Sequence, residues 1–251
     1  MKRNWRILLF VAGAVGIAFL FAIAAGPLIH PRDIRNQYAA AINSATFAER
    51  NVTDTVSAVN FDFRGFDTLG EEFILLVSVL GSLVLLRMIE DRKGKVLRDA
   101  LDEWRDVGPS DAIRLWILAM IAPKVAFGIY IVTHGQLTPG GGFQGGVILA
   151  SAALILYLGE GFTVFRDVIS HPATEIVEGA GALGFLFVGM LGWIWGRPYL
   201  TNVVPLGKAH ELTSGGTIAL ISLATGLEVA AGFILLLYAF LQENLSPVEE
   251  T

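Results

Sequence analysis

Cysteine is absent from this chain of 251 residues, and charged side chains are scarce. The missing thiols exclude disulfide bonds, iron–sulfur ligation and thiolate zinc sites within the chain. Its four histidines, at positions 30, 134, 171 and 210, show no metal-ligand spacing, so we expect neither a bound metal nor a cofactor. The net charge of −5 argues against nucleic acid as a partner.

Apolar side chains make up 54% of the residues, and only 16% are charged, against roughly 25% in an ordinary soluble domain. A helix needs about 20 apolar residues to cross the ~30 Å hydrocarbon core of a membrane. Six segments meet or approach this length, at about residues 7–28, 69–88, 113–132, 143–158, 176–195 and 217–241. We therefore predict an all-α polytopic integral membrane protein with about six transmembrane helices.

The first apolar segment resembles a signal peptide, because Ala22-Ile23-Ala24 has the composition of a cleavage site. Its apolar run is longer than the roughly 7–15 residues of a typical signal peptide, so we expect an uncleaved anchor helix. If the N-terminus is cytoplasmic, 11 of the 18 lysines and arginines fall inside, six fall outside, and Lys124 remains within the membrane. This distribution follows the positive-inside rule, and it predicts that both termini are cytoplasmic.

A glycine-rich stretch, Pro139-Gly140-Gly141-Gly142-Phe143-Gln144-Gly145-Gly146, separates the third and fourth apolar segments. A phosphate-binding loop would need Lys-Ser/Thr after the last glycine, whereas Val147 and Ile148 follow here. Backbone that enters the membrane without helical structure is a second interpretation. We favour a third one, in which Pro139 ends one span and Gly141, Gly142, Gly145 and Gly146 let neighbouring helices approach closely.

Two ionisable residues fall near the middle of predicted spans. Lys124 follows the helix-breaking Pro123 in the third span, and Glu228 lies in the sixth. A charge at the centre of a transmembrane helix costs about 2.5–3.5 kcal/mol on insertion scales. Each side chain must therefore face protein or water, or lose its charge. The sequence leaves two roles open, a structural Lys124–Glu228 pair or a proton-responsive site beside an ion path.

Glu71 and Glu72 stand at the start of the second predicted span. A carboxylate in the first turn of a helix is favoured by the helix dipole, and Asp67-Thr68 followed by Glu71 also has the pattern of a helix N-cap. However, only about 16 apolar residues follow Glu72, which is short for a full crossing, so we expect the glutamates to lie inside the hydrocarbon boundary. We expect Arg64 and Asp67 to orient the turn before them as an ion pair.

The rear of the chain resembles the B subunit of Mrp-type multisubunit Na+/H+ antiporters, the MnhB family. The similarity begins with HGQLTPGGGFQGGVILASA and continues through GRPYLTN and LEVAAGFIL, over roughly residues 112–241. It implies a four-span MnhB-like domain over residues 112–251.

The front of the chain resembles a different part of the same assemblies. Its VNFDFRGFDTLGE stretch is similar to the FRGFDTxGE element at the C-terminal end of the large A-type antiporter component, which also occurs in a small component of membrane-bound hydrogenases. The resemblance implies a two-span unit over residues 1–88, joined to the rear domain by a charged cytoplasmic connector at 89–111. It also matches Glu71 to the glutamate of that element, a candidate for the cation or proton path, whereas Glu72 matches no such position.

Together the two resemblances imply a non-enzymatic subunit of a Na+/H+ antiporter in a prokaryotic cell membrane, with other antiporter subunits, lipid, Na+ and H+ as partners. The residues expected at the ion path are Glu71, Lys124, Glu228 and Asp67. Those expected to act structurally are Arg64, Pro139, Gly140, Gly141, Gly142, Phe143, Gly145 and Gly146. One alternative is a membrane-arm subunit of a hydrogenase-type respiratory complex, and another is a purely structural scaffold.

Overall fold

All regular structure in the computed structural model, which describes residues 11–23, 37–90 and 109–244, is helical, and no strand occurs in these ranges. Five of the described helices are long and apolar enough to cross a membrane. A shorter apolar helix, Val11–Ile23, falls within the first predicted span. The predicted fold class, a polytopic all-α membrane protein, is therefore confirmed.

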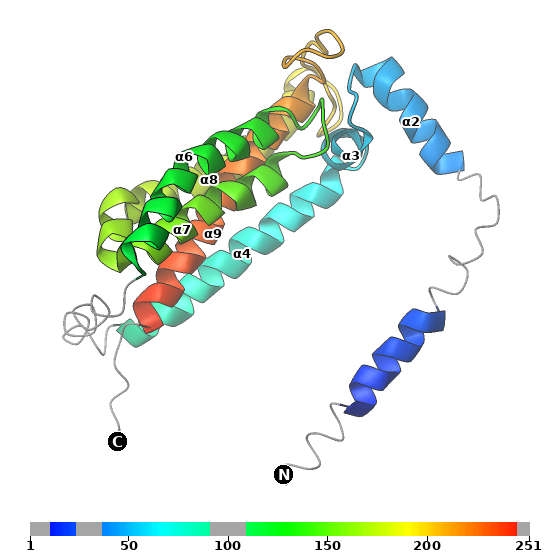
Figure 1. Ribbon diagram of the computed structural model, residues 1–251. Helices are drawn as coiled ribbons and strands as arrows, with labels where there is room; N and C mark the ends of the chain where they lie inside the picture. Colours follow the sequence, from blue (N-terminus) through cyan, green and yellow to red (C-terminus); the bar gives the residue numbers. More distant parts are fainter. Residues whose placement is uncertain (1–10, 24–36, 91–108, 245–251) are drawn as a thin grey trace. The chain divides into compact units, whose positions relative to one another are not determined.

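The chain divides into two compact units, residues 1–41 and 42–251, and the apolar helix Val11–Ile23 belongs to the first. The five long helices belong to the second unit, where Figure 1 shows α4 beside the bundle of the other four. They are α4 (Gly65–Glu90), α6 (Asp111–Thr133), α7 (Gly142–Val168), α8 (His171–Ile194) and α9 (Thr217–Asn244). Before α4 come α2 (Gln37–Arg50), α3 (Thr55–Ala58) and a π-helix, η1 (Val59–Phe63).

Helix α9 is the most enclosed of the five spans, with 56% of its most apolar window buried. It contacts α7, α8, α4 and α6, so its apolar side chains are covered on several faces. Val79 and Leu83 of α4 pack with Leu235 and Ala239 of α9 in one cluster. Val79 also lies beside Gly232, and Phe61 before α4 packs with Ile218 and Ile221 at the start of α9, so α4 and α9 run in the same direction, as the predicted second and sixth spans should.

Glycines let α7 approach α6 and α9 closely. A Cβ atom on Gly145 would lie 2.8 Å from the Gly128 carbonyl of α6. One on Gly146 would lie 2.8 Å from the Val229 Cβ of α9. Any side chain at these two positions would force α7 away from its neighbours. The fourth predicted span thus packs between the third and the sixth through backbone surfaces.

Several predicted boundaries were wrong. The fourth span was expected to be short, at about 143–158, but α7 has 27 residues and continues past a non-helical Gly161, whose φ is 79°. The fifth span was expected to begin at about 176, but α8 begins at His171, so the connection between α7 and α8 is short. Between the first and second predicted spans, where no helix was expected, the described residues form α2, α3 and η1. Of the connector expected at 89–111, residues 91–108 lie outside the described ranges.

A polar network on the outer side of the bundle joins segments that are distant in the sequence. Asp62 of η1 accepts hydrogen bonds from Arg50 Nε at 2.7 Å and from Asn202 Nδ2 at 2.9 Å. Asn202 also donates to the Gly215 carbonyl at 2.9 Å and accepts from the Thr217 N–H at 3.0 Å, at the start of α9. The Asp62 carboxylate thus connects the end of α2 to the loop before α9.

We expect Asp62→Ala to destabilise the protein by about 1–3 kcal/mol, because it removes the acceptor of one hydrogen bond from each of two half-buried side chains, Arg50 and Asn202. The Asp62 side chain is only 7% exposed. Asp67→Ala is the matched control, because the Arg64–Asp67 ion pair is 60% and 50% exposed and exposed pairs contribute at most about 1 kcal/mol. Thermal unfolding of the purified protein would measure both changes. Equal effects of the two variants would contradict a stabilising role for the network.

Candidate functional site

Glu228 is almost completely buried in the middle of the most enclosed helix. Its side chain is 1% exposed, and it is the twelfth of the 25 residues in the span Thr217–Leu241. At 1.5 Å per residue, it lies about 16 Å from the start of that span, close to the centre of a ~30 Å hydrocarbon core. The carboxyl group predicted to lie deep in the membrane is therefore enclosed by protein.

Glu72 of α4 faces Glu228. It is 2% exposed, and its carboxyl group lies close enough to interact with Glu228 and with Thr225, one turn earlier on α9. Further along both helices, Val79 and Leu83 of α4 pack in one cluster with Leu235 and Ala239 of α9, so the contact between the two helices continues beyond the carboxyl groups. The two parallel helices thus place two buried carboxyl groups opposite one another.

A third carboxyl group comes from α8. Glu178 is 4% exposed and interacts electrostatically with Glu228. Two glycines make this approach possible. A Cβ on Gly232 of α9 would lie 3.3 Å from Glu178 Oε1, and one on Gly181 of α8 would lie 2.8 Å from the Glu228 Cα. We refer to Glu72, Glu178 and Glu228 as the glutamate cluster.

The glutamate cluster has few polar partners among the described residues. Both side-chain oxygens of Glu72 and of Glu228, Glu178 Oε1 and the Thr225 hydroxyl have no hydrogen bond of normal geometry there, although Glu72 and Glu228 are close enough to share one proton. A buried carboxylate without a partner is costly, so each of these groups needs a proton, a cation or water. The described residues include no group of three acidic, histidine or cysteine side chains arranged to hold one metal ion. The three carboxyl groups therefore form a row of separate acceptors and not one chelating site.

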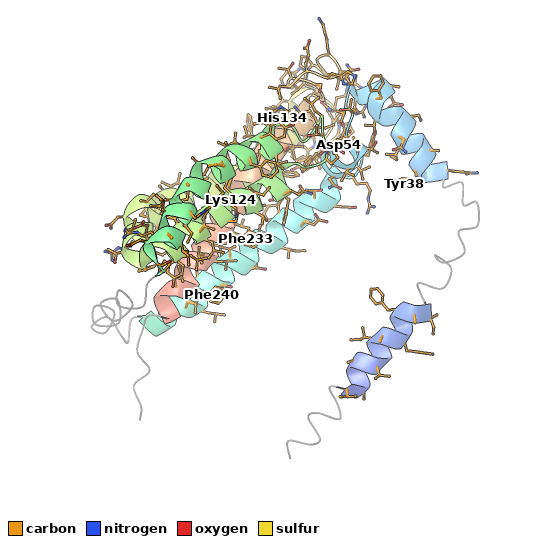
Figure 2. The ribbon with its side chains drawn as sticks, viewed as in Figure 1. Tyr38, Asp54, Lys124, His134, Phe233 and Phe240 are labelled. Atoms are coloured by element: carbon orange, nitrogen blue, oxygen red, sulfur yellow. The ribbon has the colours of Figure 1, made fainter. Side chains whose placement is uncertain are left out.

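Lys124 lies elsewhere, on α6, about halfway along the helix in Figure 2. Helix α6 continues through Pro123, and the Lys124 ammonium donates to Ser151 Oγ of α7 at 2.7 Å. Ser151 Oγ in turn donates to the Ile148 carbonyl at 2.6 Å. The structure therefore does not contain the Lys124–Glu228 pair that the sequence left open. Lys124 belongs to a second polar position within the bundle, separate from the glutamate cluster.

Glu71 and Asp67 are exposed on α4, outside the cluster. Arg64 and Asp67 form an ion pair, as expected. The predicted N-cap at Asp67-Thr68 was wrong, because α4 already begins at Gly65 and Thr68 donates its hydroxyl to the Asn60 carbonyl at 2.6 Å. The chain before Asp67 was expected to be loop, but η1 extends the helical path outward.

The glycine-rich stretch forms a turn at the outer end of α6 and α7. Gly140 and Gly141 have φ values of 157° and 122°, which side chains rarely adopt, and Gly142 begins α7. A Cβ on Gly142 would collide with the Ser222 carbonyl and lie 2.7 Å from the Thr225 Cβ on α9. Phe143 is partly exposed beside this contact. The stretch thus positions α7 against the part of α9 that leads to Glu228.

Sequence reasoning missed Glu72 and Glu178 as candidate site residues. A signal for Glu72 was present, since Thr68, Glu72, Val79 and Leu83 repeat at helical spacing and are all buried. Glu71 lies about 100° away on the same helix, so only one of the two adjacent glutamates can face α9. Glu178 falls just inside the predicted fifth span, beside the turn before it, and its charge was interpreted as solvated, although entry into that span was left open; α8 in fact begins at His171, so Glu178 is well within the helix.

The comparisons with known proteins extend over both parts of the chain. Residues 112–235 match the family model described as a domain related to the MnhB subunit of Na+/H+ antiporters. An uncharacterized protein of Methanocaldococcus jannaschii is 31% identical over 237 residues, which cover 85% of this chain and 88% of that protein. The probable A/B-type component of a K+/H+ antiporter of Rhizobium meliloti is 27% identical over 80% of this chain, but only 21% of its own length is covered.

A solved structure aligns with almost the whole chain. It belongs to the membrane-bound sulfane sulfur reductase, described as an archaeal respiratory membrane complex. The TM-score is 0.71 at 26% sequence identity, and the alignment covers 94% of this chain and 98% of the other. The resemblance stated for the rear of the chain is confirmed by the family model, which covers its helices from the start of α6 into α9. The chain therefore belongs to the family of proteins related to the MnhB subunit of Na+/H+ antiporters.

Proposed function

We propose that the chain is a non-enzymatic subunit of a multisubunit monovalent-cation/proton antiporter, and that the glutamate cluster lies on its cation or proton path. The observation that carries this proposal is the row of three buried carboxyl groups on three membrane helices, with almost all their oxygens unpaired. A purely structural role would favour pairing each carboxyl with a donor, because unpaired buried polar groups cost stability. Groups that alternately bind and release a proton or a cation need room for it instead.

The similarity to the Rhizobium meliloti protein supports this function, since that protein is a probable A/B-type component of a K+/H+ antiporter. The alignment spans 80% of this chain within one polypeptide, which agrees with A-like and B-like parts being joined here. Because the family is described by Na+/H+ antiport and this relative by K+/H+ antiport, both cations belong in any test.

Vesicles from cells that express the complete complex provide that test. We expect cation-driven proton movement, followed with a pH-sensitive dye, to disappear when this chain is deleted and to return when it is supplied again. Sodium, potassium and lithium would be compared at equal ionic strength. Proton movement that is unchanged without this chain, in vesicles where the other subunits still assemble, would exclude the proposed function.

A second candidate function is that of a membrane subunit in a redox-driven complex. The observation that favours it is the end-to-end alignment with a chain of the sulfane sulfur reductase complex. Because this chain contains no cysteine, iron–sulfur clusters in such a complex would have to belong to other subunits. Purification of the tagged chain in mild detergent distinguishes the two candidates. Iron and a visible cluster spectrum in the purified complex favour the redox complex, and their absence favours the antiporter.

A further inference from the structure

Glu71 lies at the same depth in the membrane as Glu228, although it faces away from it. Glu72 is opposite Glu228 in the register between α4 and α9, and Glu71 is its neighbour in the chain. Glu71 is the seventh of the 22 residues of the span Gly65–Leu86, about 9 Å from its start and therefore inside the hydrocarbon boundary. The helical path continues outward beyond Gly65 through η1, where Phe61 packs with Ile218 and Ile221 near the start of α9. Glu71 thus lies within the membrane-spanning part of α4 and not in the water outside it.

The side of α4 that carries Glu71 has no partner among the described residues of this chain. It consists of positions 71, 74, 78, 81 and 85, all exposed, and we call it the Glu71 face. Ile74 is 70% and Leu85 is 67% exposed, and a Cβ on Gly81 would meet nothing within 4 Å. The spacing alternates between three and four residues, which is the pattern of a seam that packs against another helix. Small side chains at Ser78 and Gly81 allow such a helix to approach closely.

Charge determines what can cover the Glu71 face. Lipid tails offer no compensation for a carboxylate at this depth, so a lipid-facing position is unfavourable. A second copy of this chain packed through the same face about a two-fold axis would bring like-charged Glu71 side chains together. Among the described cations, Arg64 pairs with Asp67, and Lys124 bonds to Ser151 of α7.

We propose that the Glu71 face of α4 is the docking surface for a transmembrane helix of a different membrane subunit, which presents a lysine or arginine to Glu71. This inference rests on the proposed function in one respect, namely that the chain works within a multisubunit complex. An ion pair enclosed by two helices satisfies the carboxylate where lipid cannot, and it selects one partner and one register. Such a contact would also place a fixed positive charge beside the glutamate cluster.

Site-specific photocrosslinking in the assembled complex tests the contact. Because the chain has no cysteine, Ile74→Cys provides a single site for a benzophenone-maleimide label on the Glu71 face. Leu183→Cys on α8, which is 67% exposed, is the matched control with a similar exposed fraction. We expect the label at position 74 to react with one helix of another subunit, and mass spectrometry to locate a lysine or arginine within about one turn of the crosslinked residue. Crosslinks only to lipid, to a second copy of this chain, or to a helix without a basic residue would overturn the proposal.

Charge reversal tests the chemistry of the contact. We expect Glu71→Lys to lower co-purification of the crosslinked subunit by at least about tenfold, since breaking an enclosed charge pair has effects of this size. Changing the partner's basic residue to glutamate in the same cells should restore it. The amount of Glu71→Lys chain in the membrane controls for insertion, and Glu71→Gln provides a milder variant if insertion fails. Normal assembly of both Glu71 variants would overturn the proposal. Assembly is read here without any transport measurement, so failure of this inference would leave the proposed function standing.

Discussion

Glu228→Gln is expected to reduce cation-dependent proton movement by about 10²-fold or more, because a positioned group that exchanges a proton typically contributes at least this factor. Glutamine has nearly the same size and shape as glutamate, so the packing of α9 against α4 and α8 should persist. It cannot bind or release a proton near neutral pH, and it offers a cation no negative charge. Proton movement in vesicles, normalised to the amount of assembled complex, measures the change.

The thermal stability of the Glu228→Gln variant should not fall together with its transport activity. Removing a buried carboxylate that has no described partner also removes its desolvation cost, so Glu228→Gln should leave thermal stability unchanged or raise it. A structural ion pair would behave differently, since loss of one member leaves the other charge buried and destabilises the protein. Loss of transport together with preserved stability would therefore identify Glu228 as a functional group, and a large loss of stability would indicate a structural one.

Glu72→Gln and Glu178→Gln should act in the same direction as Glu228→Gln, with Glu72 the more sensitive because it faces Glu228 directly. If the three carboxyl groups act in series, the double variant Glu72→Gln with Glu228→Gln should be little worse than either single one. Glu211→Gln is the matched control, because Glu211 is exposed in the loop before α9. Full transport activity in all three cluster variants would exclude the cluster from the ion path.

The last five predicted spans and their order could be predicted from apolar runs alone, because a bilayer imposes a minimum length on any crossing helix, whereas the first is described only over Val11–Ile23. Helix ends could not be predicted equally well. The apolar signal of the fourth span weakens after Leu158, yet α7 continues to Val168. Glu160, in this last part of α7, forms an ion pair with Arg114 of α6. A charge that appears to belong to a loop can thus lie within a helix when a neighbouring helix supplies its counter-ion.

The residues of the candidate site were harder to predict from the sequence than the helix ends. A family resemblance directed attention to Glu71, whereas burial distinguishes Glu72 as the glutamate that faces α9. Adjacent residues on a helix differ by about 100°, and the sequence of one helix does not state which side its neighbour occupies. Glu178 was missed because a charge near the end of a predicted span is usually solvated, and the sequence does not show that it faces Glu228. Glu228 was accessible to prediction, because a carboxyl group in the middle of a long apolar run has few explanations other than function or pairing.

Gly181→Ala is expected to destabilise the protein strongly, whereas Gly179→Ala, two residues away on the same helix, should not. A Cβ on Gly181 would lie 2.7 Å from the Ala224 carbonyl and 2.8 Å from the Glu228 Cα, and these backbone atoms of α9 cannot move without the helix. Overpacking of this kind costs about 1–3 kcal/mol or more. A Cβ on Gly179 would meet nothing within 4 Å, so alanine there should be neutral or stabilising by up to about 1 kcal/mol through its higher helix propensity.

Thermal unfolding in the same detergent compares the stability of the Gly181→Ala and Gly179→Ala variants. Cation-dependent proton movement in vesicles compares their transport activity. Separation of α8 from α9 at Gly181 would move Glu178 away from Glu228, so the Gly181→Ala complex that still assembles should also lose cation-dependent proton movement. Gly179→Ala should keep both stability and transport, because it changes only the outer surface of α8. If the two alanine variants proved equally stable and equally active, the close α8–α9 contact could not be what positions the glutamate cluster.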